Sequence, residues 1–119
     1  MEYLAHISDD GRVQTVSEHL HGTGELAAGF AAPFGAADEA RAAGLLHDIG
    51  KYSAAFQQRI RGSAVSVDHS TAGAQEARNR RDLPAALAIA GHHGGIPDCG
   101  NLNDAADDTT LQGRLKRKL

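Results

Sequence analysis

Five histidines and one aspartate, spread through the chain, limit what this sequence can fold into more than any other feature. His47 and Asp48 begin the run His-Asp-Ile-Gly-Lys, and the other four histidines lie far from it in the sequence. Imidazole and carboxylate are the ligands that borderline and harder divalent metals share. A two-metal hydrolytic centre needs such a set, whereas a structural zinc site usually contains several cysteines, and this chain has one. We therefore predict a fold that brings six metal ligands together: His19, His47, Asp48, His69, His92 and His93.

The position of each candidate in the sequence favours a site assembled between helices. A carboxylate that bridges two ions about 3.5–4 Å apart is the simplest way to hold them, and Asp48 can do so while His47 binds one of them. His92 and His93 precede two glycines, where the chain can turn both imidazoles toward one ion. All five histidines are expected near helix ends, as a metal site in a helical bundle requires.

A single histidine is more often an ordinary surface or partly buried residue than a metal ligand. The ordered combination of His-Asp-x-Gly-Lys, Asp-His-Ser and His-His-Gly would rarely arise by chance, so we favour the metal site. His6 and His21 are interpreted as ordinary histidines. His6 precedes the first predicted helix, and His21 lies two positions from His19, so that it faces away on a helix.

Two residues near the predicted ligands carry groups that suit a phosphate. Lys51 can either neutralise a phosphate or hold the bridging carboxylate, and we favour the phosphate role. Ser70, at a predicted helix start, can offer a hydroxyl or a backbone N–H to a phosphate oxygen. We thus assign catalytic roles to Asp48 and Lys51, and substrate binding to Lys51 and Ser70.

Composition favours an all-α fold, and the ligand positions described above then predict a helical bundle with the metal site between helices. Alanine, the best helix former, supplies much of the 41% hydrophobic share, and aromatic residues make up 4%. At this length, residues 1–119 fit a single domain. Residues 3–16 are expected to form a loop or brief hairpin. The predicted helices are one capped by Ser17 and ending near Pro33, one capped by Asp38 over 39–49, and others over 53–61, 71–77, 85–92 and 111–119.

Charge, cysteine content and the lack of long apolar segments argue against several classes of protein. A formal net charge of −3 does not announce a nucleic-acid binder, although a local basic patch matters more than the sum. The single cysteine cannot form an internal disulfide, which favours a reducing compartment. No segment is apolar enough for a signal peptide or a membrane span. We expect a soluble, cytoplasmic protein with no membrane partner.

The ordered motifs around these residues resemble the HD-type nuclease domain of the CRISPR type I helicase-nuclease. The resemblance rests on Glu18-His19-Leu20, His47-Asp48 with Lys51, Asp68-His69-Ser70 and His92-His93-Gly94, and it covers essentially the whole chain. It implies an all-helical HD fold that cuts single-stranded DNA with two divalent transition metals such as iron, manganese, cobalt or nickel. It also implies the CRISPR surveillance complex and a helicase as partners.

The resemblance further implies how the ligands divide between the two ions. The first ion is held by the residues matching His19, His47 and Asp48 together with a later aspartate. The second is held by those matching Asp48, His69, His92 and His93. In the family, the later aspartate lies in a helix beyond the His-His-Gly motif, and this chain ends before that helix. We therefore expect the first metal position to be one ligand short. If that position stays empty, only one ion is bound.

Two alternatives stay open. The missing aspartate motivates a non-catalytic, nuclease-like module that binds DNA or protein. Other HD proteins hydrolyse nucleotides, and this chain is compatible with that chemistry. The cyclic-dinucleotide branch is less compatible, because Gly94-Gly95-Ile96-Pro97 follows the paired histidines where that branch has a Glu and a Gly-Tyr-Pro signature.

Overall fold

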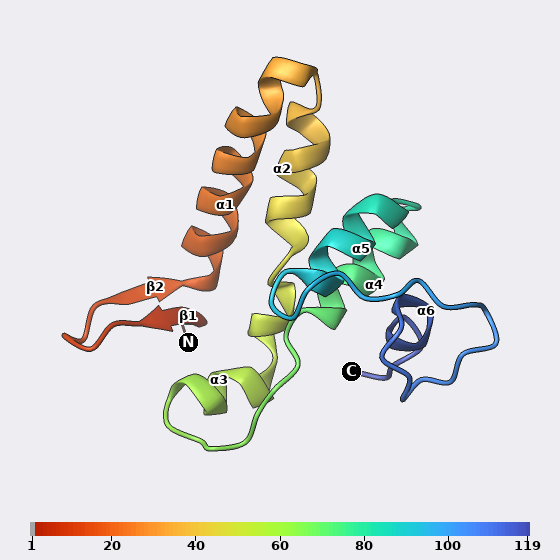
Figure 1. Ribbon diagram of the computed structural model, residues 1–119. Helices are drawn as coiled ribbons and strands as arrows, with labels where there is room; N and C mark the ends of the chain where they lie inside the picture. The colour runs from red at the N-terminus through yellow and green to blue at the C-terminus, as the bar shows by residue number, and fades with distance from the viewer. Residues whose placement is uncertain (1) are drawn as a thin grey trace.

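Helices account for most of the structure, a computed structural model that describes residues 2–119 (Figure 1). The prediction of an all-α fold is therefore confirmed, with a small amount of strand at the start of the chain. Two short antiparallel strands form the expected hairpin, and their register is irregular between Leu4 and His6. The elements are β1 (Leu4–Ile7), β2 (Val13–Thr15), α1 (Val16–Ala31), η1 (Ala32–Phe34), α2 (Ala37–Leu46), η2 (Ile49–Tyr52), α3 (Ala54–Ile60), α4 (Thr71–Asn79), α5 (Leu83–Gly91) and α6 (Leu111–Arg114), where η denotes a 3-10 helix.

Helix α1 begins directly after β2 because Thr15 and Glu18 cap it reciprocally. The Thr15 hydroxyl accepts from the Glu18 N–H at 3.1 Å, and the Glu18 carboxylate accepts from the Thr15 N–H at 3.0 Å. This capping box satisfies two backbone donors that a helix start leaves free. The prediction of Ser17 as the cap is therefore wrong, since Ser17 lies inside the first turn. The early start places His19 in that turn.

Helices α1 and α2 run side by side as an antiparallel pair (Figure 1). They approach closely where Gly24 meets Gly44, because a Cβ on Gly44 would collide with the Gly24 backbone. The antiparallel arrangement brings the start of α1 next to the end of α2. Asp38 does not cap α2, contrary to prediction. The cap position is Ala36, and Asp38 pairs with Arg41 one turn later.

Helix α2 ends at Leu46 rather than continuing to Ile49 as predicted. Asp48 leaves the helical conformation, with φ −121° and ψ 26°, and η2 follows it. Only glycine fits at position 50 after this break, because a Cβ there would collide with the backbone of His69. The chain before α4 consequently lies against η2, and His69 is brought toward Asp48.

Alanines form much of the core around α4, α5 and α6. Ala74, Ala86 and Ile89 are almost fully buried, and Leu111 and Leu115 from the carboxy-terminal segment pack on them. Small side chains let α4 and α5 pack closely, and the pair sits beside the lower end of α2 (Figure 1). The predicted helix over 111–119 is shorter than expected and ends at Arg114. Within residues 2–119, no helix combines the length and the apolar character that crossing a membrane requires.

Candidate metal centre

The carboxylate of Asp48 lies at the middle of a histidine cluster and turns one oxygen toward each half of it. Its Oδ2 atom is 2.9 Å from His19 Nε2 and 3.2 Å from His47 Nε2. Its Oδ1 atom is 2.9 Å from His92 Nε2 and 3.7 Å from His69 Nε2. His93 Nε2 is 4.0 Å from the same oxygen. We call His19, His47 and Asp48 the first donor set, and Asp48, His69, His92 and His93 the second donor set; within each, the donor atoms lie no more than 4.8 Å apart.

Every donor comes from a helix end or from the segment next to one. The first donor set joins the first turn of α1 to the residues that follow α2. The second donor set adds the residue two positions before α4 and the two residues after α5. The structure thus brings together all six residues that the sequence singled out as ligands.

Two of the imidazoles are oriented by backbone carbonyls, which fixes the ring nitrogen that carries a hydrogen. The Nδ1 atom of His47 is 2.6 Å from the carbonyl oxygen of Gly44, and that of His92 is 2.6 Å from the carbonyl oxygen of Ile89. A carbonyl only accepts, so each Nδ1 carries a hydrogen, and Nε2 is the ring atom left to face a metal once its own proton is lost. At His92 Nε2 lies 2.9 Å from a carboxylate oxygen of Asp48, a contact that either a proton on Nε2 or a bound cation satisfies. The donor set therefore fits a divalent metal.

The electrostatics keep the carboxylate ionised and most of the imidazoles neutral. Burial alone would raise the pKa of Asp48, but hydrogen bonds with His47 and His92 outweigh it and hold the pKa well below its ordinary value. Burial lowers the pKa of His19, His69 and His93. The hydrogen bond to Asp48 raises the pKa of His92. An anionic carboxylate and neutral imidazoles are the forms that bind metals.

The sequence matches the HD domain family over residues 16–116, which include all six donors. The chain belongs to the HD domain family. HD domains are typically metal-dependent hydrolases that bind divalent ions, in agreement with the cluster around Asp48. Among curated proteins, none matches this sequence.

In this HD domain Lys51 lies next to the carboxylate of Asp48, on its buried side. Its side chain is almost fully buried, and its ammonium donates to the carbonyl of Ala5 at 3.2 Å and lies 3.5 Å from Asp48 Oδ2. Burial at this depth favours the role of holding the carboxylate over direct contact with a phosphate. Lys51 is therefore placed to hold Asp48 rather than to contact a phosphate directly.

Ser70 is also buried, and its contacts reveal two residues that the sequence analysis missed. Its hydroxyl accepts from Arg114 Nη2 at 2.8 Å. Asp68 Oδ1 accepts from the backbone N–H groups of Ser70 and Thr71 at 3.2 and 3.1 Å, and so caps α4. An Asp three positions before the first residue of a helix, bonded to the backbone N–H groups that follow it, is a recognisable local signal. Nothing local marks Arg114, because its partners lie more than 20 residues away.

The two histidines interpreted as ordinary have different surroundings. His6 lies edge-on beside His19, with ring centroids 4.9 Å apart, so it borders the first donor set. Burial lowers the pKa of His6, followed by the charge of Lys51. His21 is exposed and lies 2.9 Å from the carbonyl oxygen of Ser17, outside both donor sets.

Proposed function

We propose that this HD domain is a metal-dependent nuclease that hydrolyses phosphodiester bonds in single-stranded DNA. The observation that carries the proposal is the position of Asp48, which presents one oxygen to each of two histidine groups. Paired metal positions with a shared carboxylate suit in-line displacement at a phosphorus atom, where both the attacking and the leaving oxygen need stabilisation. The resemblance of the ordered motifs to the CRISPR nuclease domain supports single-stranded DNA as the substrate.

The two donor sets would each hold one divalent ion. Such ions act as Lewis acids toward phosphoryl oxygens and lower the pKa of water. The residues of the chain hold the ionised carboxylate in place, orient His47 and His92 through backbone carbonyls and limit solvent access. Since His93 is 57% exposed, whereas His19 is 17% exposed, a polymeric substrate reaches the second donor set more easily than the first.

The histidine-rich ligand sets favour transition metals over magnesium, which prefers oxygen ligands. Iron, manganese, cobalt and nickel are the candidates we propose. The resemblance also supports a CRISPR surveillance complex and a helicase as partners in a cytoplasmic setting. These finer assignments rest on the motifs rather than on the geometry of the cluster.

A cleavage assay tests the proposal. The protein is stripped with a chelator, reloaded with manganese, cobalt, nickel or iron, and incubated with circular and linear single-stranded DNA. We expect cutting only after reloading, with two ions per chain at full activity. Asp48→Asn should abolish cutting, while Asp107→Asn, an exposed aspartate outside the cluster, serves as the matched control. Folded, metal-loaded protein that leaves both DNA forms intact would defeat the nuclease proposal.

The same assay separates the alternatives. Deoxynucleoside monophosphates are supplied in a parallel reaction. Phosphate release from these nucleotides without DNA cutting favours a nucleotide phosphohydrolase. DNA binding without hydrolysis of either substrate favours a non-catalytic module.

A further inference from the structure

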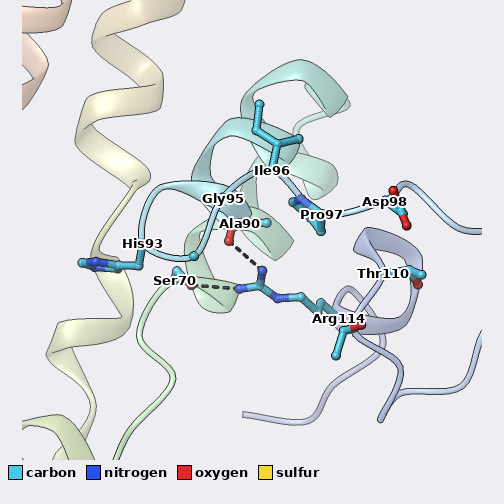
Figure 2. Close-up of a pocket in the computed structure, with 11 residues that line it drawn as sticks. Ser70, Ala90, His93, Gly95, Ile96, Pro97, Asp98, Thr110 and Arg114 are labelled. Carbon is cyan, nitrogen blue, oxygen red and sulfur yellow. Dashed lines mark hydrogen bonds between the residues drawn. The ribbon is translucent and has the colours of Figure 1, made fainter.

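A cavity of about 400 Å³ opens beside the second donor set (Figure 2). Its wall is built from Ser70 before α4, the loop 93–98 after α5, residues 109–110 before α6, and Arg114 at the end of α6. His93 belongs both to this wall and to the second donor set. The volume falls within the range of small-ligand sites and suits a group of roughly one nucleotide. Any chain whose phosphodiester reaches the second donor set therefore has this cavity next to it.

Arg114 supplies positive charge to the wall of this cavity. Its guanidinium donates to the carbonyl of Ala90 at 2.6 Å, to the Ser70 hydroxyl at 2.8 Å and to the Thr71 hydroxyl at 3.0 Å. All three acceptors are uncharged. In the part of the chain that the structure describes, Arg114 joins no ion pair, whereas its neighbour Arg117 lies 3.0 Å from a carboxylate oxygen of Asp68.

The hydrogen bonds to neutral oxygens orient the guanidinium; the Asp68 carboxylate, which accepts from the same Thr71 hydroxyl, feels its charge but forms no direct ion pair with it. Figure 2 shows Arg114 on the cavity wall between His93 on one side and Asp98 on the other, with its guanidinium directed toward Ser70 and Ala90. Asp98 is exposed and repels an anion from the outer end. A phosphate is therefore attracted toward the inner part of the cavity, between Arg114 and His93. Arginine keeps its charge at any working pH, so the attraction is permanent.

We propose that this cavity seats the nucleotide that adjoins the cleaved phosphodiester, with Arg114 attracting its phosphate. The inference rests on the proposed function, because it assigns a subsite to the same DNA substrate. Arg114 also ties α6 to the residues beside His69 and His92, since its acceptors belong to Ser70 and Ala90. Binding of the substrate and the geometry of the second donor set are thus coupled through one side chain.

The test measures binding of a fluorescent thymidylate decamer with phosphorothioate linkages, which resist cutting, to manganese-loaded protein. Thr109 is an exposed residue of the cavity wall, and Thr109→Trp fills the space while leaving the contacts of Arg114 in place. Ala106→Trp adds the same ring at an exposed position outside the wall and is the matched control. We expect Thr109→Trp to weaken binding about tenfold, because a nucleotide kept out of the cavity loses its charge-assisted contact with Arg114, and Ala106→Trp to bind as wild type.

A second variant tests the charge. Arg114→Met should weaken binding and lower the slope of log affinity against log salt by about 0.7, the value for one phosphate of a single strand. A merely structural role for Arg114 would leave that slope unchanged. Wild-type affinity for both Thr109→Trp and Arg114→Met overturns the proposal, and so does wild-type protein that fails to bind the decamer.

The two proposals fail in different ways. Binding that depends on the cavity, without any cutting of ordinary DNA, overturns the nuclease function and leaves the nucleotide subsite standing. Cutting of ordinary DNA by a protein whose Thr109→Trp and Arg114→Met variants bind like wild type overturns the subsite alone. Circular dichroism and metal content, measured for each variant, exclude misfolding as the cause of weaker binding.

Discussion

The first and second donor sets share Asp48 but differ in their supporting structure and in their access to solvent. His19 and His47, in the first set, are 17% and 15% exposed and come from helices that pack along their lengths. His92 and His93, in the second set, are 24% and 57% exposed and follow the end of α5. The shared carboxylate is only 3% exposed, so the difference arises from the histidines. The first set is the more enclosed, and the second is the one at which we propose that a substrate would meet the metal.

The largest expected effect follows from the sharing of Asp48. Four ligands hold a structural zinc with roughly 10–16 kcal/mol, so one ligand accounts for about 3 kcal/mol, or about a hundredfold in affinity. Asp48→Asn removes the charged ligand from both sets and should cost that factor for each ion. His19→Gln removes a ligand from the first set alone and should weaken one ion only. Isothermal titration with manganese counts the ions and gives both affinities.

Equal losses in these two variants would contradict the bridging position of Asp48 and would make the two sets independent. His21→Gln is the matched control for His19→Gln, because His21 is exposed on the same helix outside both sets. It should leave both affinities unchanged.

The second expected effect concerns the buried cation beneath the shared carboxylate. Removing one partner of a buried ion pair costs about 3–5 kcal/mol, since the other charge is left uncompensated. Lys51→Met should therefore lower the free energy of unfolding of the metal-free protein by about 3 kcal/mol, measured by urea denaturation. In the metal-loaded protein the ions compensate Asp48, so the cost should be smaller.

Metal should consequently stabilise Lys51→Met by more than it stabilises the wild type. Lys118→Met, at an exposed lysine near the carboxy terminus, controls for loss of charge and should change stability little. A metal-induced gain in unfolding free energy that is the same in Lys51→Met and wild type would show that Lys51 does not act on the centre through Asp48.

The third prediction compares the protons that each set releases. In the metal-free protein the hydrogen bond to Asp48 raises the pKa of His92 above 6.5, whereas burial lowers the pKa of His19 below it. His92 therefore keeps its proton to higher pH than His19 does. Near neutral pH, filling the second set should release more protons than filling the first, because a metal binds only the neutral imidazole. The release should fade as the pH rises above the pKa of His92.

Titration in buffers of different ionisation enthalpy measures this release. His19→Gln isolates the second set, and His69→Gln isolates the first. If both variants release the same number of protons at pH 6.5, the assigned difference between the pKa values of His92 and His19 is wrong.

Most of the candidate site was predictable because its residues occur in short ordered motifs, and the fold places the six predicted ligands together. The break after α2 was not predictable. Local pattern favours a helix through Ile49, but the contacts of Gly50 with His69 and of Lys51 with Ala5 bend the chain at Asp48. Such contacts join positions far apart in sequence, and helical periodicity carries no information about them.

The helix starts show the same limit at short range. Ser17 and Asp38 both have side chains that favour a cap, so the sequence offered them as helix starts. At α1 Thr15 and Glu18 satisfy each other and move the start upstream, whereas α2 begins without a side-chain cap. Residue type alone ranks candidate caps, and the geometry of the preceding chain selects among them.

The smallest expected effect concerns Asp68, which anchors the exposed second set as helix packing anchors the first. Its carboxylate caps α4 and pairs with Arg117, next to His69. Asp68→Asn keeps an acceptor oxygen but loses the charge, and should lower the free energy of unfolding at pH 7 by about 1 kcal/mol, as loss of a helix cap does. The affinity of the second set for its ion should also fall, whereas the affinity of the first set should be unchanged.

The pH dependence of the unfolding free energy distinguishes the contribution of the charge of Asp68 from that of its hydrogen-bonding geometry. Burial alone would raise the pKa of Asp68, but hydrogen bonds from Thr71 and Ser70 outweigh it and leave the pKa below its ordinary value of 3.8. A depressed pKa means that the carboxylate stabilises the fold above pH 3.8, and that this contribution disappears as the pH falls through the lower folded value. The wild-type and Asp68→Asn stability curves should therefore converge below pH 3.8. If the difference in unfolding free energy between wild type and Asp68→Asn persists in acid, the effect comes from the geometry of the amide. The charge of Asp68 would then make no contribution to the second donor set.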